Sequence, residues 1–325
     1  MHLLAIISGF ILDLLVGDPR WLYHPVRLIG KLIEILENVL RKAFPKTGKG
    51  ERLAGLFLVV LVCSMTAGVA FGVLYAAYYI NFWLGFAAEV LMCYQIFAVR
   101  CLKDESMKVY YELEKGDLEG ARRAVSMIVG RDTQSLGEEG VTKAAVETIA
   151  ENTSDGTLAP LFYMIIGGPV LGWFYKAVNT MDSIVGYKND KYINFGRYGA
   201  KFDDVMNFIP ARICAIFMII ASFLMGLDAN NAAKIFKRDR FNHASPNSAQ
   251  TEAVMAGALN IQLAGDAWYF GKLYKKPTMG DANRNIEYVD IKRANNLLYA
   301  TAIVALLILG ALRVLLQVAS VGMII

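Results

Sequence analysis

Three long apolar segments constrain the fold of this chain more than any other feature. Leu53–Ile80 contains no charged residue, Val205–Leu227 contains only Arg212, and Leu297–Ile325 contains only Arg313. A helix of about 20 apolar residues is long enough to cross the hydrocarbon layer of a bilayer, and each segment exceeds that length. The sequence therefore predicts that each of the three spans a membrane.

Shorter apolar segments extend this prediction. They are Leu3–Val16, which contains Asp13, Trp83–Val99 and Leu158–Tyr175. Hydrophobic residues make up 56% of the 325 residues and charged residues 19%, a more apolar balance than the core of a soluble enzyme requires. We therefore predict an all-α, polytopic integral protein of the cell membrane with about 4–6 transmembrane or re-entrant helices. The first segment lacks a basic leader and a cleavage site, so it is predicted to be retained.

Polar segments separate the apolar ones, at 17–52, 101–157, 177–204 and 228–296. No low-complexity linker or fixed-period repeat interrupts the chain, which favours a single membrane domain over residues 1–325. The distribution of Lys and Arg favours the cytoplasm for all of these segments except 177–204. However, Ile166-Gly167-Gly168-Pro169 predicts a broken or re-entrant helix, which would keep both of its ends near one compartment. The side of the membrane that holds 177–204 stays open.

Several classes of function are disfavoured by composition. The four cysteines are Cys63, Cys93, Cys101 and Cys214. None has metal-ligand spacing, so neither a zinc site nor a disulfide scaffold is expected. The chain has three histidines, too few for a metal centre built from histidine, and a net charge of +4 gives no reason to expect a nucleic-acid partner.

The segment Glu147–Gly156 concentrates three carboxylates and one amide beside an apolar run. Glu147 and Glu151 fall on one face of a helix, four residues apart. Asp155 extends that stripe if the helix continues, although Asp155-Gly156 is also typical of a helix end. Like charges at this spacing repel, so the pattern indicates either a cation or ligand site or a solvated helix terminus.

Four further polar clusters border apolar segments. They are Asp18–Arg27, which includes His24; Asn179–Asp190, which includes Asp182 and Lys188; Asp203–Arg212, which includes Asp204 and Asn207; and His243–Glu252, which includes Asn247. Each has a structural alternative. Asp203 and Asp204 would be stabilised at a helix start by the helix dipole. A lone histidine such as His24 is more often structural than catalytic, and Ser245-Pro246-Asn247-Ser248 is typical of a capped turn.

Taken together, the clusters favour a site for magnesium and phosphate. Carboxylate and amide oxygens are ligands for a hard cation, and Arg27, Lys188 and Arg212 could bind phosphoryl oxygens. The sequence has no phosphate-binding loop, because Thr47-Gly48-Lys49-Gly50 lacks the earlier glycine and the final Ser or Thr. It also has no hydrolase or zinc-protease motif, so any nucleotide site is of an unfamiliar type.

These motifs resemble those of the CobD/CbiB family of cobalamin biosynthesis, the membrane enzymes known as adenosylcobinamide-phosphate synthase. The resemblance runs nearly end to end. It covers Gly17-Asp18-Pro19, His24-Pro25-Val26, Val129–Thr133, Glu147–Leu161, Lys176–Ser183, Gly186-Tyr187, Asp203-Asp204, Pro210-Ala211-Arg212, Ser245–Ser248 and Met255–Leu259. Each motif is short, but their order over this length is specific.

The resemblance implies an ATP- and Mg²⁺-dependent ligase. Its expected substrates are a corrinoid, adenosylcobyric acid, and (R)-1-aminopropan-2-ol or its O-phosphate, joined through an amide bond. Expected partners are the lipid bilayer and other membrane enzymes of the corrinoid pathway. The candidate magnesium ligands are Glu147, Glu151, Asp155, Asp182, Asp203 and Asp204. Asn152, Asn179 and Asn247 would orient substrate, Arg27, Lys188 and Arg212 would hold phosphate, and His24 or His243 would take the amine proton.

Two other classes of function remain open. The first is a transporter or sensor for an anionic or corrinoid ligand, similar to the related AmpE-like proteins, which Asp13, Glu89 and the break at Gly167–Pro169 would suit. The second is a magnesium-dependent intramembrane transferase, although a second aspartate-rich motif of the type such enzymes carry is missing from the sequence.

Overall fold

The computed structural model describes residues 1–19, 21–269 and 271–322. Within them, five helical stretches are long and apolar enough to cross a membrane: Gly48–Ile80, Phe82–Glu114, Glu138–Val185, Arg197–Leu224 and Asp290–Ala319. The predicted all-α, multi-pass architecture is confirmed. His2–Val16 is a shorter apolar helix, and the last three residues of the predicted span Leu297–Ile325 lie outside the described residues.

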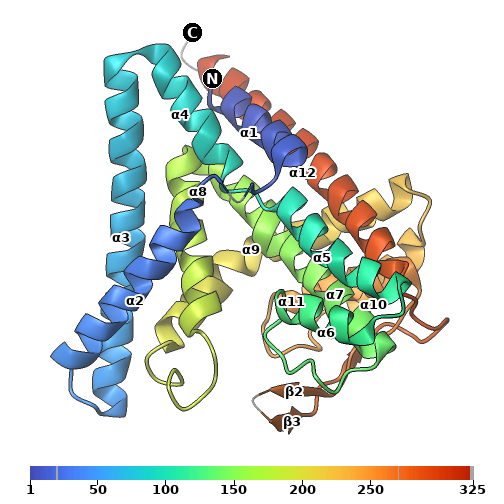
Figure 1. Ribbon diagram of the computed structural model, residues 1–325. Helices are drawn as coiled ribbons and strands as arrows, with labels where there is room; N and C mark the ends of the chain where they lie inside the picture. Colours follow the sequence, from blue (N-terminus) through green and yellow to red (C-terminus); the bar gives the residue numbers. More distant parts are fainter. Residues whose placement is uncertain (20, 270, 323–325) are drawn as a thin grey trace. The chain divides into compact units, whose positions relative to one another are not determined.

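The helices and strands follow one another in the order shown in Figure 1. The helices are α1 (His2–Val16), α2 (Pro25–Ala43), α3 (Gly48–Ile80), α4 (Phe82–Tyr94), α5 (Val99–Glu114), α6 (Leu118–Ser126), α7 (Glu138–Asn152), the π-helix η1 (Thr153–Leu158), α8 (Ala159–Val185), α9 (Arg197–Leu224), α10 (Ala229–Asp239), α11 (Ser248–Leu259) and α12 (Asp290–Gly322). Four short strands form two antiparallel pairs. β1 (Leu263–Ala264) pairs with β4 (Thr278–Met279), and β2 (Ala267–Tyr269) pairs with β3 (Lys272–Tyr274).

Two compact units make up the structure, and the chain passes between them four times. Unit 1 comprises Met1–Ala98, Ala159–Asn207 and Leu312–Ile325, and unit 2 comprises Val99–Leu158 and Phe208–Ala311. Neither unit is one continuous segment, and two helices, α9 and α12, contribute residues to both. The expectation of a single domain stays a prediction.

In unit 1, the long helix α3 packs against α2, α4 and α8, and α1 packs against α4. α2 begins at His24-Pro25, where the His24 side chain accepts the backbone N–H of Val26 and Pro25 occupies the first helical turn. This helix is amphipathic: Ile29 and Ile33 are buried on one face, while charged side chains occupy others. Sequence spacing of this kind fixes which face of α2 packs on α3.

Helix α8 is broken at the predicted position. Gly167 and Gly168 have non-helical backbone angles, and Gly168 has a φ of 65°, a left-handed value that favours glycine. The Arg313 guanidinium donates hydrogen bonds to the carbonyl oxygens of Ile165 at 2.9 Å and Ile166 at 3.4 Å. In lipid, carbonyls freed by a helix break need such donors. The interruption is therefore confirmed, and Arg313 has a structural role in it.

In unit 2, α11 packs closely against α10 and α7. The contact with α10 depends on Gly257, because a Cβ at that position would lie 2.6 Å from the Cα of Ala232. All twelve residues of α11 are buried, so the helix forms the centre of the unit. Its residues are mostly small, which permits the close approach of its neighbours.

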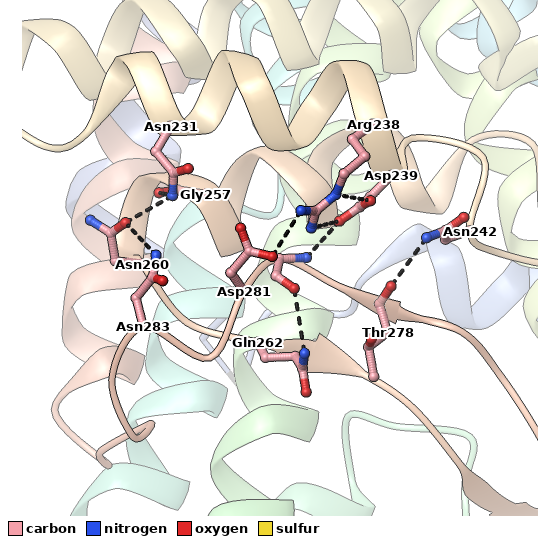
Figure 2. Close-up of polar contacts among 11 residues, drawn as sticks. Asn231, Arg238, Asp239, Asn242, Gly257, Asn260, Gln262, Thr278, Asp281 and Asn283 are labelled. Atoms are coloured by element: carbon pink, nitrogen blue, oxygen red, sulfur yellow. Dashed lines mark hydrogen bonds and ion pairs between the residues drawn. The ribbon is translucent and has the colours of Figure 1, made fainter.

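A polar network fixes the β1–β4 pair to α10 (Figure 2). Asp239 is 4% exposed and accepts hydrogen bonds from the Arg238 guanidinium at 2.7 and 2.8 Å and from the Gly280 N–H at 2.8 Å. Asn242 donates to the Thr278 carbonyl at 3.1 Å. Burial alone would raise the pKa of Asp239, but Arg238 and Gly280 outweigh it and hold that pKa below its usual value.

Replacing Asp239 should destabilise the protein more than replacing its neighbour Asp281, which also accepts from Arg238 but is partly exposed. We expect Asp239→Asn to lower the free energy of unfolding by about 2 kcal/mol and Asp281→Asn by about 0.5 kcal/mol or less. Because the folded-state pKa is lowered, the Asp239 contribution is present above about pH 4 and lost as pH falls through that pKa. Unfolding in detergent measures both variants. Equal losses in the two variants would contradict the larger contribution expected of the buried Asp239.

Candidate functional site

Unit 2 contains a polar pocket beside α7, with a cavity volume of about 130 Å³. We call it the acid pocket. It is lined by Ile128, Val129, Gly130, Arg131, Glu147, Thr148, Glu151, Asn152, His243, Glu252, Ala264, Gly265, Ala267, Tyr269 and Lys276. Glu147 and Glu151 therefore share one face of α7, as their spacing predicts, and that face opens into a pocket rather than into bulk solvent. Three carboxyl groups and three basic side chains meet there.

Glu147 is held by donors on both of its carboxylate oxygens. The Arg131 guanidinium hydrogen-bonds to Oε2, and the Ala264 N–H donates to Oε1 at 2.7 Å. Both side chains of the ion pair are largely buried. The protein itself thus supplies a cation beside the two like charges of α7, which reduces their repulsion.

Glu151 connects α7 to the start of α11. The Ser248 hydroxyl donates to Oε1 of Glu151 at 2.7 Å. Asn247 stands at the position before α11 but makes no capping hydrogen bond with its side chain. Its Oδ1 instead accepts from the Arg212 guanidinium at 3.2 Å. The interpretation of this segment as an ordinary side-chain cap was wrong, because both polar side chains are used in contacts with other elements.

Glu252 is the third carboxyl of the acid pocket and is only 5% exposed. Among the described residues, none donates a hydrogen bond to it. Burial raises its pKa well above the usual value, and the charges of Glu151 and Glu147 raise it further, whereas Lys276 and Arg131 lower it. A buried carboxyl with a strongly perturbed pKa in a pocket is typical of a functional group.

The basic side chains of the pocket include His243 and Lys276. The backbone N–H of Ser245 donates to Nδ1 of His243 at 3.0 Å. Burial lowers the pKa of His243, although Glu151 opposes that effect. Lys276 donates from Nζ to the Tyr269 hydroxyl at 2.8 Å, on the segment that forms one wall of the pocket.

Of the two alternatives for the end of α7, a helix that continues and a helix that stops at Asp155-Gly156, the structure shows the first. Asp155-Gly156 does not end the helix, because the π-helical turns of η1 follow α7 directly and lead into α8. Buried neighbours such as Thr153, whose hydroxyl donates to the Ile149 carbonyl at 2.7 Å, keep the segment helical. Asn152 lines the pocket and donates to the Thr148 carbonyl at 3.0 Å, whereas Asp155 is not among the lining residues. π-helical turns often occur at functional sites.

Other predicted site residues belong to unit 1. Asp203 is buried, and its Oδ2 accepts from Asn207 at 3.0 Å, while Asn207 accepts from the Tyr175 hydroxyl at 2.7 Å. Asp182 and Asp204 lie within electrostatic range of Asp203. Since α9 begins at Arg197, Asp203 and Asp204 are in its interior, and the alternative that they mark a helix start was wrong.

The remaining predicted residues have separate surroundings in unit 1. His24 caps α2, with Asp18 3.8 Å from its Nε2. Arg27 lies over the Tyr23 ring, and Lys188 is exposed. Asn179 lies on α8, near Asp203. The predicted residues are therefore divided between the two units, and their convergence in one site stays a prediction.

The metal-ligand set also stays a prediction. In the part of the chain that the structure describes, no group of three or more His, Cys, Asp or Glu side chains is arranged to hold a metal ion by itself. Mg²⁺ in enzymes commonly uses one or two carboxylates together with water and phosphate oxygens. The oxygen-rich acid pocket is compatible with that mode of binding.

Several residues of the pocket were not predicted as site residues. They are Arg131, Glu252, Tyr269 and Lys276; Ser248, which hydrogen-bonds to the lining residue Glu151, was also not predicted. Arg131 and Ser248 lie inside motifs that carry the family resemblance, which was the available signal. The other three come from segments whose approach to α7 depends on tertiary packing.

The fold and the acid pocket define a multi-pass helical membrane protein with a polar, charge-balanced site. A family model described as "CobD/Cbib protein" matches residues 6–298, and the chain belongs to this family. It is 47% identical to "Cobalamin biosynthesis protein CobD" of Clostridium perfringens, over 97% of this chain and 99% of the relative.

A second relative, "Cobalamin biosynthesis protein CbiB" of Salmonella typhimurium, is 44% identical over 96% of this chain and 98% of the relative. A CobD protein of Listeria monocytogenes is 47% identical over 97% of this chain and all of the relative. No solved structure matches. Membership of the family assigns the chain to cobalamin biosynthesis.

Replacing Arg131 should destabilise unit 2 by removing the cation beside three carboxyl groups. We expect Arg131→Gln to cost about 3 kcal/mol, because Glu147 is left as a largely buried charge. Adding Glu147→Gln should restore part of that stability, since the unpaired charge is removed. A double-mutant cycle of unfolding free energies measures the coupling. Additive effects of the two changes would contradict the ion pair.

Proposed function

We propose that this protein is an ATP-dependent amide ligase of the cell membrane. It joins a side-chain carboxylate of adenosylcobyric acid to the amine of (R)-1-aminopropan-2-ol or its O-phosphate, giving adenosylcobinamide or adenosylcobinamide phosphate. The observation that carries the proposal is the acid pocket, one small space lined by Glu151, Glu252, His243 and Lys276. The names of its relatives support the pathway.

The chemistry of amide formation needs both kinds of group. A carboxylate is a poor electrophile, so it must first be activated, here as an acyl phosphate. An amine is protonated near neutral pH and must lose a proton before it attacks. Carboxyl groups attract the ammonium form and accept its proton, whereas Lys276 and the N–H of His243 suit the oxygen atoms of the acyl and phosphoryl groups.

The size of the pocket limits what enters it. The cavity volume of about 130 Å³ is below the roughly 300 Å³ or more of sites that enclose a whole drug-sized ligand, so the cavity suits the reacting end of a large molecule or a very small one. A corrinoid macrocycle exceeds it, so the ring is expected to lie outside while its reacting side chain reaches in. The aminopropanol unit is small enough to be enclosed.

Magnesium and ATP are part of the proposal. Glu151 uses one oxygen for Ser248 and has its other oxygen available, whereas both oxygens of Glu147 accept hydrogen bonds within the protein. Glu151 is therefore the stronger candidate for holding Mg²⁺ in the acid pocket. Bound magnesium would neutralise negative charge on the phosphoryl groups. Asp155, Asp182, Asp203 and Asp204 remain further candidates.

Neutralising Glu151 should abolish ligation without unfolding the protein. We expect Glu151→Gln to lower the rate of amide formation on the order of 100-fold or more, and Asp155→Asn to have a comparable effect. Product is measured by mass spectrometry with purified protein, both substrates, ATP and Mg²⁺. Glu139→Gln is the matched control, since Glu139 lies on the same helix but is exposed and paired with Lys143. Full activity in both test variants would refute the proposed ligand roles.

A nutritional test separates the ligase from a transporter. A deletion strain should grow on cobinamide but not on cobyric acid, because only the step between them is lost. A transporter for a corrinoid would instead lose uptake while synthesis continued. A topology reporter fused near Asn189 would establish which side of the membrane holds 177–204.

A further inference from the structure

In each of the three histidines of the chain, Nδ1 is the ring nitrogen that makes a hydrogen bond, but the partner is not the same in all three. Nδ1 of His243 accepts the Ser245 N–H at 3.0 Å, and Nδ1 of His24 accepts the Val26 N–H at 3.2 Å. His2 differs, because its Nδ1 lies 2.5 Å from a carboxylate oxygen of the buried Glu89. A ring nitrogen that accepts a hydrogen bond carries no proton.

This geometry fixes the tautomer of His243. With Nδ1 accepting a backbone N–H, the proton of the neutral ring is on Nε2. Burial, the largest effect, lowers the pKa of His243 and favours that neutral ring, and the charge of Lys276 acts in the same direction, whereas Glu151, Glu147 and the Ser245 backbone act against it. Nε2 makes no hydrogen bond with any of the described residues, and the side chain lines the acid pocket. His243 therefore presents an N–H donor to the pocket and has no free lone pair with which to accept a proton.

We propose that His243 donates its Nε2–H to the acyl oxygen of the substrate and is not the proton acceptor for the amine. The inference rests on the proposed function and assigns a role within it. As the amine nitrogen bonds to the activated carbon, the carbonyl electrons move onto the oxygen. A preorganised donor stabilises the negative charge that develops there.

The remaining protons and electrons balance without the imidazole. The ammonium gives one proton to a pocket carboxylate, and Glu252 accepts no hydrogen bond from any described residue that would compete for it. After the carbon–nitrogen bond forms, the carbonyl re-forms and the bond from carbon to the phosphate oxygen breaks. The departing phosphate takes the second amine proton.

The tautomer is directly measurable, because the chain contains only three histidines. Full-length protein labelled with ¹⁵N-histidine in detergent micelles should show His243 and His24 protonated at Nε2 and bare at Nδ1 at neutral pH. His2 should show a protonated Nδ1 and acts as the internal contrast. Single substitutions at each position assign the signals. A protonated Nδ1 at His243 would overturn the proposal.

A matched pair of variants tests the role in ligation. Glutamine carries an amide N–H near the position of Nε2, whereas asparagine reaches only the position of Nδ1. We expect His243→Gln to stay within about tenfold of the wild-type rate and His243→Asn to lose on the order of 10² to 10³-fold. Thermal unfolding of both variants confirms that they are folded.

The possible outcomes separate the two proposals. A wild-type protein that makes no amide would refute the proposed function. Active wild type with equal and complete loss in His243→Gln and His243→Asn would indicate a proton acceptor and would refute the donor role alone. Active wild type with unchanged His243→Asn would show that His243 does not act on the substrate.

Discussion

The ion pair between Arg131 and Glu147 is the interaction on which the acid pocket depends. Three carboxyl groups cannot share a small, partly buried space unless cations or hydrogen-bond donors compensate them. Arg131 supplies a fixed charge, and the second oxygen of Glu147 accepts the Ala264 N–H. One carboxylate thereby joins α7 to the loop after α6 and to β1. The same contacts of Glu147 therefore compensate the negative charge of the pocket and hold three segments of unit 2 together.

In unit 1, backbone carbonyl oxygens must be compensated by hydrogen-bond donors in a similar way. A helix break in a membrane-spanning segment exposes carbonyl oxygens that lipid cannot hydrogen-bond. In α8 the break at Gly167 and Gly168 is compensated by Arg313, which donates to the carbonyls of Ile165 and Ile166. The charge that interrupts the last apolar segment of the sequence thus has a structural reason.

The sequence was sufficient for features that depend on local pattern. Hydropathy predicted the spanning helices, and Gly167-Gly168-Pro169 predicted the break in α8. The spacing of Glu147 and Glu151 predicted a shared face, and that face lines a pocket. Local pattern left two alternatives open at Asp155-Gly156. This dipeptide, typical of a helix end, lies inside continuing helical turns because its neighbours are buried. Contacts between distant segments, such as the one between Ser248 and Glu151, depend on tertiary packing and cannot be predicted from the spacing of residues in the sequence.

The three pocket carboxyls have unequal environments, and that difference matters more than their number. Glu147 accepts hydrogen bonds on both oxygens, Glu151 on one, and Glu252 on neither among the described residues. Groups of one chemical type can perform different tasks when their surroundings differ. Both oxygens of Glu147 are used in hydrogen bonds that hold the fold, and one oxygen of Glu151 is available to bind a ligand. Glu252 can accept a hydrogen bond or a proton from a substrate that enters the pocket. With His243 fixed as a donor, proton acceptance in this pocket is left to a carboxyl group.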